Sequence, residues 1–208
     1  FCKKKKIFKT TDKLYSELRR KDTSKKDVVT LQKEDMDRLL EYWHNKDREF
    51  YLLLKMLRFT GARISETLRL KWKDINFQTG TIEYPNKVHG QIQYFPITPQ
   101  IAEILTELRS INNKSTNVFR WSHTTYSRLR LWLSASMQEL GIELGKGNAF
   151  HVIRKTFATE LFEKNVEIYD IKDLMRHSCI DTTLNHYKQF RTKKLSEILS
   201  QVQPEEVK

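Results

Sequence analysis

HVIRKTFATEL, residues 151–161, combines the apolar spacing of a helix with two side chains that can bind an anion. We predict a helix over residues 151–164. His151 and Arg154 lie three residues apart and share one helix face, so they can converge on a single phosphate. A guanidinium suits this role because its planar fork donates two hydrogen bonds to phosphate oxygens. The alternative is an ordinary solvated helix face, on which both residue types are common.

The upstream string TGARISETLRL, residues 60–70, supplies a second arginine. Residues 50–60 have the composition of a buried helix that Gly61 ends, and the apolar spacing of residues 64–70 predicts another helix with Arg63 near its start. Two arginines can flank both non-bridging oxygens of a phosphate, where negative charge accumulates during phosphoryl transfer. Taken alone, Arg63 is more typical of an ordinary exposed arginine, and its place within residues 61–66 argues for the phosphate-binding role.

YPNKVHGQIQYFPI, residues 84–97, belongs to the one clear β region. Residues 81–84 and 91–95 alternate between apolar and polar side chains across a polar turn at residues 86–90, so we predict a hairpin with Lys87 at or beside its tip. Lys87 is a candidate general acid that protonates a leaving oxygen. Because hairpin turns are rich in lysine, a solvated turn lysine is the alternative.

LMRHSCIDTTLNHY, residues 174–187, contributes a histidine and a tyrosine. The phenol of Tyr187 has an ordinary pKa of about 10, so it needs positive surroundings or a base to attack phosphorus at neutral pH. His177 and His151 could donate or accept protons at the phosphate, and the sequence leaves their individual roles open. A single tyrosine is more often structural, so the interpretation of Tyr187 depends on the groups that accompany it.

Helical patterns dominate the rest of the chain, which predicts an α+β fold that is mainly α-helical with a small antiparallel β-sheet. Thr30 offers a helix N-cap, so we expect a catalytic domain over residues 28–200, preceded by a basic arm or interdomain linker at 1–27 and followed by a polar tail at 202–208. The other predicted helices cover residues 101–108, 126–140, 168–175, 182–189 and 192–201.

The chain has 208 residues and a formal net charge of +12, which favours a polyanionic partner, either nucleic acid or an anionic membrane surface. The longest apolar stretch, residues 51–59, is interrupted by Lys55 and Arg58 and is far shorter than the ~20 residues of a spanning helix. Cys2 and Cys179 form neither a disulfide framework nor a C-x-x-C metal pair, so we expect no metal site and a reducing cytoplasm.

Much of the positive charge lies near the N-terminus. Residues 1–26 hold nine lysines and two arginines against three acids, a net charge of +8. An unbroken cationic run provides candidate DNA-binding residues through sequence-independent phosphate contacts; it consists of Lys3, Lys4, Lys5 and Lys6. A solvated charged tail is an equally good interpretation of this segment.

In their order and spacing the four strings resemble the catalytic domain of the tyrosine recombinases, the phage-integrase and Xer-like family, over roughly residues 28–200. The resemblance implies the catalytic-domain fold of that family and a site-specific DNA recombinase of the integrase or resolvase type. Tyr187 would form a 3′-phosphotyrosyl bond, and because this ester stores the bond energy, no cofactor would be required. The catalytic set that the resemblance implies is Arg63, Lys87, His151, Arg154, His177 and Tyr187.

Two positions depart from the pattern of the family. Arg176 stands where a glycine commonly precedes the second histidine, and Lys155 stands where histidine is frequent. We interpret both as candidate phosphate contacts, with a solvated helix-end residue as the alternative for Arg176. Family members usually carry a separate helical core-binding domain that closes around DNA, so we expect this chain to be a fragment or a minimal form.

The resemblance also implies double-stranded DNA as the partner and a homo-oligomer of four protomers on two duplexes. The expected location is the cytoplasm, in association with the nucleoid, and it is the cytoplasm of the host cell if a virus or mobile element encodes the protein. The predicted helix at residues 192–201 would dock into a neighbour or onto its own domain. Two other functions remain open: a type IB topoisomerase-like or telomere-resolving enzyme with the same nucleophile, and a catalytically inactive architectural protein. The complete set of reacting groups argues against the inactive protein.

Overall fold

The computed structural model describes residues 30–85, 92–143 and 149–184. These ranges are mainly helical with one small antiparallel sheet, which confirms the predicted α+β class, and none of their helices is long and apolar enough to cross a membrane. The helices are α2 (Lys33–His44), α3 (Arg48–Thr60), α4 (Ile64–Thr67), α5 (Pro99–Ile111), α6 (Tyr126–Glu139), α7 (Ala149–Glu163) and α8 (Ile168–Leu174), with 3-10 turns at Trp72–Asp74 and His123–Thr125. The strands are β1 (Ile75–Asn76), β2 (Thr81–Pro85) and β3 (Ile92–Pro96).

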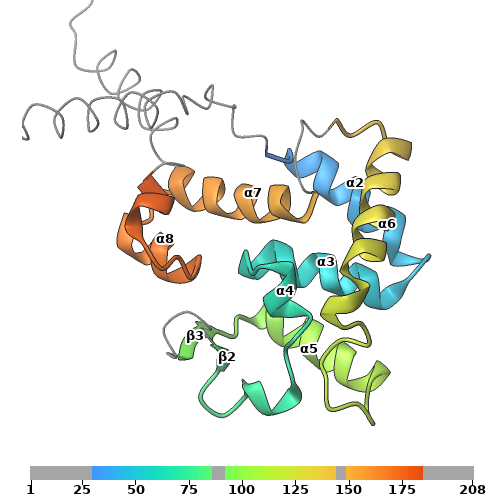
Figure 1. Ribbon diagram of the computed structural model, residues 1–208, viewed down its shortest axis with the longest axis horizontal. Helices are drawn as coiled ribbons and strands as arrows, with labels where there is room; N and C mark the ends of the chain where they lie inside the picture. The colour runs from blue at the N-terminus through green and yellow to red at the C-terminus, as the bar shows by residue number, and fades with distance from the viewer. Residues whose placement is uncertain (1–29, 86–91, 144–148, 185–208) are drawn as a thin grey trace, which may run out of the picture.

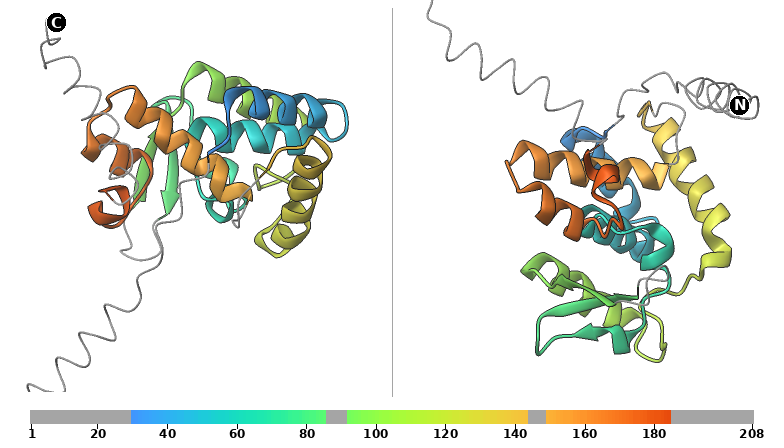
Figure 2. Two further views of the ribbon diagram at one scale, coloured as in Figure 1. Left: turned by 90° about the horizontal axis from the view of Figure 1, so that it is seen from above. Right: turned by 60° about the vertical axis from the view of Figure 1, so that its left-hand side comes forward.

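Helix α3 lies at the centre of the molecule, in contact with α2, α5 and α7 (Figure 1). Its sequence is apolar on almost every face, and such a helix is stable in water only when other elements cover it. The buried apolar side chains are Phe50, Leu52, Leu53, Leu54, Met56 and Leu57. Asp47 caps the helix by accepting a hydrogen bond from the amide of Phe50 at 3.0 Å. Figure 2 shows α7 and α8 on one side of α3, with α5 and the sheet on the other.

Gly61 ends α3 in the left-handed conformation, with a φ of 55°, and its amide donates to the carbonyl of Leu57 at 2.9 Å. A Cβ atom at this position would lie less than 3.0 Å from both Cδ1 and Cε1 of Phe157 on α7. Only glycine therefore allows the end of α3 to approach α7 this closely. This approach places the residues that follow Gly61 next to the face of α7 that carries Arg154, whose guanidinium donates to the Gly61 carbonyl.

Aromatic side chains join α2, α3 and α6. Trp43 of α2 packs edge-on against Phe50 of α3, with ring centroids 4.5 Å apart, and stacks on Trp132 of α6 at 5.9 Å. The buried indole N–H of Trp43 donates to the hydroxyl of Ser136 at 3.0 Å, so this polar group is satisfied inside the core. Phe150 at the start of α7 also packs edge-on against Phe50, which anchors the first turn of α7 on the same cluster.

The three strands pair antiparallel in the order β1-β2-β3. Pro85 of β2 is the register partner of Ile92 of β3, which confirms the predicted hairpin. Strand β1 was not predicted, because two residues are too short to show the alternation of a strand. Ile82, Tyr84 and Phe95 are buried, so one face of the hairpin packs on the helices.

Helix α2 begins later than the sequence predicted. Gln32, not Thr30, occupies the N-cap, and its side chain makes no capping bond. Tertiary contacts explain the difference, because Leu31 is buried and its amide donates to the hydroxyl of Thr156 on α7 at 2.8 Å. Residues 30–32 are therefore tied to α7 at Leu31 and do not start a helix.

Helix α4 is shorter than the predicted helix over residues 64–70 and ends at Thr67. The chain turns there because the carbonyl of Leu70 accepts from the amide of Val118 at 2.9 Å, which ties this segment to a distant part of the chain. The short helix keeps Arg63 at its N-cap, directly after the loop that follows α3.

Candidate active site

A cavity of about 420 Å³ lies where α4, the start of α6 and the start of α7 meet. Three of its lining residues, Arg63, His151 and Arg154, are candidate phosphate ligands from two different strings of the sequence. His151 is exposed to solvent at this cavity, whereas Arg154 is buried. The rest of the lining consists of Ala62, Ile64, Ser65, Leu68, Arg69, Tyr126 and Phe150.

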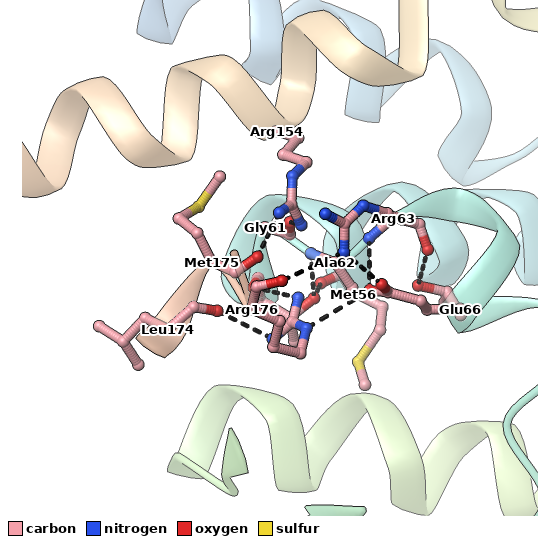
Figure 3. Close-up of polar contacts among 11 residues, drawn as sticks. Met56, Gly61, Ala62, Arg63, Glu66, Arg154, Leu174, Met175 and Arg176 are labelled. Carbon is pink, nitrogen blue, oxygen red and sulfur yellow. Dashed lines mark hydrogen bonds and ion pairs between the residues drawn. The ribbon is translucent and has the colours of Figure 1, made fainter. Parts of the chain in front are cut away.

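Arg154 extends from α7 with a side chain held on two sides (Figure 3). Its Nη1 donates to the carbonyl of Gly61, and its Nη2 donates to the carbonyl of Met175. These acceptors follow α3 and α8, so one guanidinium joins three helices. Burial, followed by the charges of Arg63 and Arg176, lowers the pKa of Arg154 to about 9. The positive charge is therefore held at a cost in free energy that an anion in the cavity would offset.

Arg63 lies at the N-cap of α4 with its side chain 46% exposed. Its Nη1 donates to Oε1 of Glu66 at 2.7 Å and to the carbonyl of Arg176 at 3.3 Å. Its amide donates to Oε2 of Glu66 at 3.1 Å. This pairing across the first turn of α4 orients the guanidinium beside the cavity and restricts the motion that a surface arginine ordinarily has.

Glu66 is a residue of the site that the sequence interpretation did not single out. Burial raises the pKa of its carboxyl, but the Arg176 charge and the Arg63 hydrogen bond outweigh burial and hold the pKa below its usual value. Glu66 therefore stays ionised and bonds two guanidiniums. Its position three residues after an N-cap is the spacing of a capping glutamate, and that spacing could have identified it.

The end of α8 positions His177. The helix closes in a Schellman motif, in which the amide of Arg176 donates to Asp173 and the amide of His177 donates to Lys172, each at 3.0 Å. The imidazole is buried, and its Nδ1 lies 2.8 Å from the hydroxyl of Thr183. This hydrogen bond fixes the orientation of the ring.

The turn that carries His177 is bonded to Arg63 and Arg154, two of the three arginines that line the cavity. The carbonyl of Met175 accepts from Arg154, and the carbonyl of Arg176 accepts from Arg63. His177 follows these two acceptors directly in the chain. The structure thus brings three of the six catalytic candidates, Arg63, His151 and Arg154, to one cavity. It bonds the turn that carries a fourth, His177, to two of them.

Lys155 and Arg176, the two residues that depart from the family pattern, have different environments. Lys155 is half-buried on α7. The side chain of Arg176 is only 2% exposed, so its interpretation as a solvated helix-end residue is wrong. Its guanidinium bonds groups of the protein, and a direct phosphate contact would require the side chain to leave those partners.

The remaining candidates lie outside the described residues: Lys87, Tyr187, Lys3, Lys4, Lys5 and Lys6. Residues 180–184 are helical, in agreement with the first part of the helix predicted over 182–189. The predicted helix at 192–201 also lies outside the described ranges. The roles assigned to all these residues stay predictions.

Comparison with protein families matches residues 29–194 to the phage integrase family. Tyrosine recombinase XerA of Pyrococcus furiosus is 29% identical over 159 residues, which cover 74% of this chain and 55% of XerA. Tyrosine recombinase XerD of Listeria innocua is 27% identical over 162 residues, which cover 73% of this chain and 54% of XerD. The chain spans about half the length of these curated relatives.

Three solved structures are similar to this fold. XerH recombinase in a post-cleavage complex with a palindromic difH substrate has a TM-score of 0.70 at 24% identity, over 86% of this chain and 55% of XerH. The catalytic domain of bacteriophage HP1 integrase has a TM-score of 0.63 at 24% identity, over 78% of this chain and 88% of that domain. The Tn1549 transposon integrase in complex with circular intermediate DNA has a TM-score of 0.60 at 21% identity, over 79% of this chain and 62% of that integrase. The predicted catalytic-domain fold is thereby confirmed.

Proposed function

This chain belongs to the phage integrase family, and we propose that it is a site-specific DNA recombinase that cleaves and rejoins DNA through a 3′-phosphotyrosyl intermediate. The observation that carries the proposal is the cavity lined by Arg63, His151 and Arg154. The tyrosine recombinase relatives support this activity, and the net charge of +12 supports a polyanionic substrate.

In the proposed reaction the phenolic oxygen of Tyr187 attacks a phosphorus atom of DNA. A bond forms between this oxygen and phosphorus, the bond from phosphorus to O5′ breaks, and the 3′ phosphate stays on the tyrosine. Lys87 gives a proton to the departing O5′, while the phenolic proton passes to His151 or His177. A 5′ hydroxyl later reverses these steps, and because the ester keeps the bond energy, the reaction needs no cofactor.

The electrostatics of the cavity favour the transition state over the bound substrate. Arg154 is held by two carbonyls before any substrate arrives, so it need not reorganise when charge develops. Glu66 pairs with the guanidiniums of Arg63 and Arg176, and the charges of all three act on Arg154. Three positive charges against one negative charge make this cluster cationic. Pentacoordinate phosphorus carries more negative charge on its non-bridging oxygens than the diester does, so it gains more from these cations.

We further propose duplex DNA as the substrate, by analogy with the DNA-bound Tn1549 integrase. Lys155 and the lysine run of the 1–27 arm would contact phosphates. Four protomers would act on two duplexes, with the 192–201 segment docked into a neighbouring protomer.

Covalent trapping tests the nucleophile. Because the target site is unknown, the substrate is a library of duplexes with a randomised core, nicked at different positions a few nucleotides 3′ of candidate scissile phosphates. Cleavage releases a short 5′-hydroxyl fragment that diffuses away, so the adduct cannot reseal and accumulates. The adducts are isolated after denaturation, the DNA is sequenced, and the modified peptide is mapped by mass spectrometry.

We expect one modified residue, Tyr187, and no adduct from Tyr187→Phe. An adduct formed by Tyr187→Phe would defeat the assignment of the nucleophile. The sites selected in this way are then placed in supercoiled DNA to distinguish the enzyme classes. Relaxation of that DNA without strand exchange would indicate a topoisomerase-like enzyme. DNA binding without any adduct would indicate an architectural protein.

A further inference from the structure

Arg176 occupies a backbone position that ordinarily suits glycine or asparagine. Its φ is 52°, at the second residue after α8, in a Schellman motif. Helices α6 and α7 end in the same motif, and at the equivalent positions the chain has Gly141, with a φ of 67°, and Asn165, with a φ of 59°. The left-handed conformation is unfavourable for a long side chain. Contacts of the arginine must therefore offset this cost.

The guanidinium of Arg176 joins the ends of two helices to α4 (Figure 3). Its Nη1 donates to the carbonyl of Leu174 at 2.9 Å, and its Nη2 donates to the carbonyl of Thr60 at 3.3 Å. Its Nε lies 3.4 Å from Oε2 of Glu66. A buried side chain with partners in three segments is a structural tie between them.

The same guanidinium packs on the sheet. Its Cζ lies 4.5 Å from the ring centroid of Tyr84 on β2 and 5.4 Å from that of Phe95 on β3. Burial raises the pKa of Tyr84 to about 12, so the ring remains a neutral phenol that attracts a cation to its face. Arg176 thereby connects both strands of the hairpin to the helices around the cavity.

Arg176 also acts on Arg63 by two routes. Its carbonyl accepts from Nη1 of Arg63 at 3.3 Å, and its guanidinium pairs with Glu66, which is bonded to Arg63 as well. Strands β2 and β3 flank residues 86–91, the segment that holds Lys87. The end of β2 at Pro85 and the start of β3 at Ile92 therefore set the two points, relative to Arg63, between which this segment must run.

We infer that Arg176 is a positioning residue that clamps strands β2 and β3 to the Arg63–Glu66 pair. The clamp keeps Arg63 in a fixed relation to the strands that flank the segment with the proposed general acid, and Arg176 itself would touch neither the phosphate nor the leaving oxygen. Its catalytic consequence rests on the proposed function, whereas the clamp itself is a property of the DNA-free protein.

Amide hydrogen exchange of the DNA-free protein tests the clamp. Arg176→Met keeps much of the side-chain volume without charge or donors, and Arg176→Gly removes the side chain while it relieves the backbone. Asn165→Gly is the matched control, because it changes a left-handed residue at an equivalent helix end. We expect both Arg176 variants to speed exchange in β2 and β3 by at least about tenfold relative to α2 and α5, and the control to leave it unchanged. Unchanged protection of β2 and β3 in both Arg176 variants would overturn the clamp.

The trapping assay tests the catalytic consequence. Because a displacement of about 1 Å can cost about 10²-fold in rate, Arg176→Met and Arg176→Gly should form the adduct about 10²-fold more slowly, with little change in DNA affinity. Arg176→Lys should recover part of the rate, since it keeps a cation beside Glu66. Wild-type rates in folded Arg176→Met would refute the positioning role. If the wild-type protein forms no adduct, the proposed function fails, while the exchange experiment still decides the clamp.

Discussion

Replacement of Gly61 with alanine should destabilise the domain by about 2–5 kcal/mol, because the added methyl group meets two separate obstacles. The first is the backbone, since a φ of 55° costs a residue with a Cβ about 1–2 kcal/mol. The second is the ring of Phe157, whose Cδ1 and Cε1 would both lie less than 3.0 Å from the new Cβ. Overpacking of this kind costs about 1–3 kcal/mol.

Two further variants separate these costs. Gly80 has a φ of 65°, and no described atom lies within 4 Å of a Cβ built there, so Gly80→Ala should cost only the backbone term of about 1–2 kcal/mol. Phe157→Ala removes the ring that Gly61→Ala would strike. In that background, Gly61→Ala should therefore cost about as much as Gly80→Ala does in the wild-type protein.

Urea unfolding followed by circular dichroism gives the free energy of unfolding of each single variant and of the Gly61→Ala, Phe157→Ala double variant. We expect a coupling free energy of about 1–3 kcal/mol between the two positions. A coupling near zero would refute the close approach of α3 and α7 as the reason for glycine. The same approach places the Gly61 carbonyl at Arg154, so Gly61→Ala should also slow covalent trapping.

Lys87→Ala should slow DNA cleavage by about 10²–10⁴-fold because it removes the general acid. A substrate with sulfur in the bridging 5′ position should restore the rate of this variant, because sulfur leaves without a proton. Arg63→Ala should cleave both the ordinary and the sulfur-containing substrate slowly. Deletion of residues 1–26 should weaken binding to unrelated duplexes and reduce the slope of log affinity against log salt by about 0.9 for each phosphate that the arm neutralises in the intact protein. Glu66→Gln should lower the melting temperature most above pH 4.5, the usual pKa of this carboxyl. The difference in melting temperature from wild type should shrink as the pH falls, because the Glu66 carboxylate, whose pKa is held low in the folded protein, becomes protonated in acid.

Each of these experiments has a contrary outcome. If sulfur fails to rescue Lys87→Ala, the lysine positions DNA and another group is the acid. An unchanged salt slope would identify residues 1–26 as a solvated tail. A difference between Glu66→Gln and wild type that stays constant into acid would show that the Glu66 carboxylate contributes nothing through its ionisation.

Local patterns in the sequence predicted the elements whose signals lie within one segment. The apolar run that forms α3 ends at Gly61, and a glycine after such a run indicates a left-handed helix end without any information about tertiary contacts. The alternation on either side of the predicted turn at residues 86–90 predicted the hairpin. The spacing of His151 and Arg154 predicted that both lie on one helix face, and both line one cavity. These predictions succeeded because the helical and strand periods report which side chains share a face.

Tertiary structure alone decided which partners those side chains meet. The sequence could not show that Arg176 is buried between Glu66 and Tyr84, because these residues are far apart in the chain and no period relates them. The start of α2 was likewise set by a hydrogen bond from Leu31 to Thr156, not by the local capping signal of Thr30. The sequence places Arg176 next to His177, but it does not show whether the arginine faces water or a carboxylate. Only packing determines how far its charge is desolvated and which charged groups it meets.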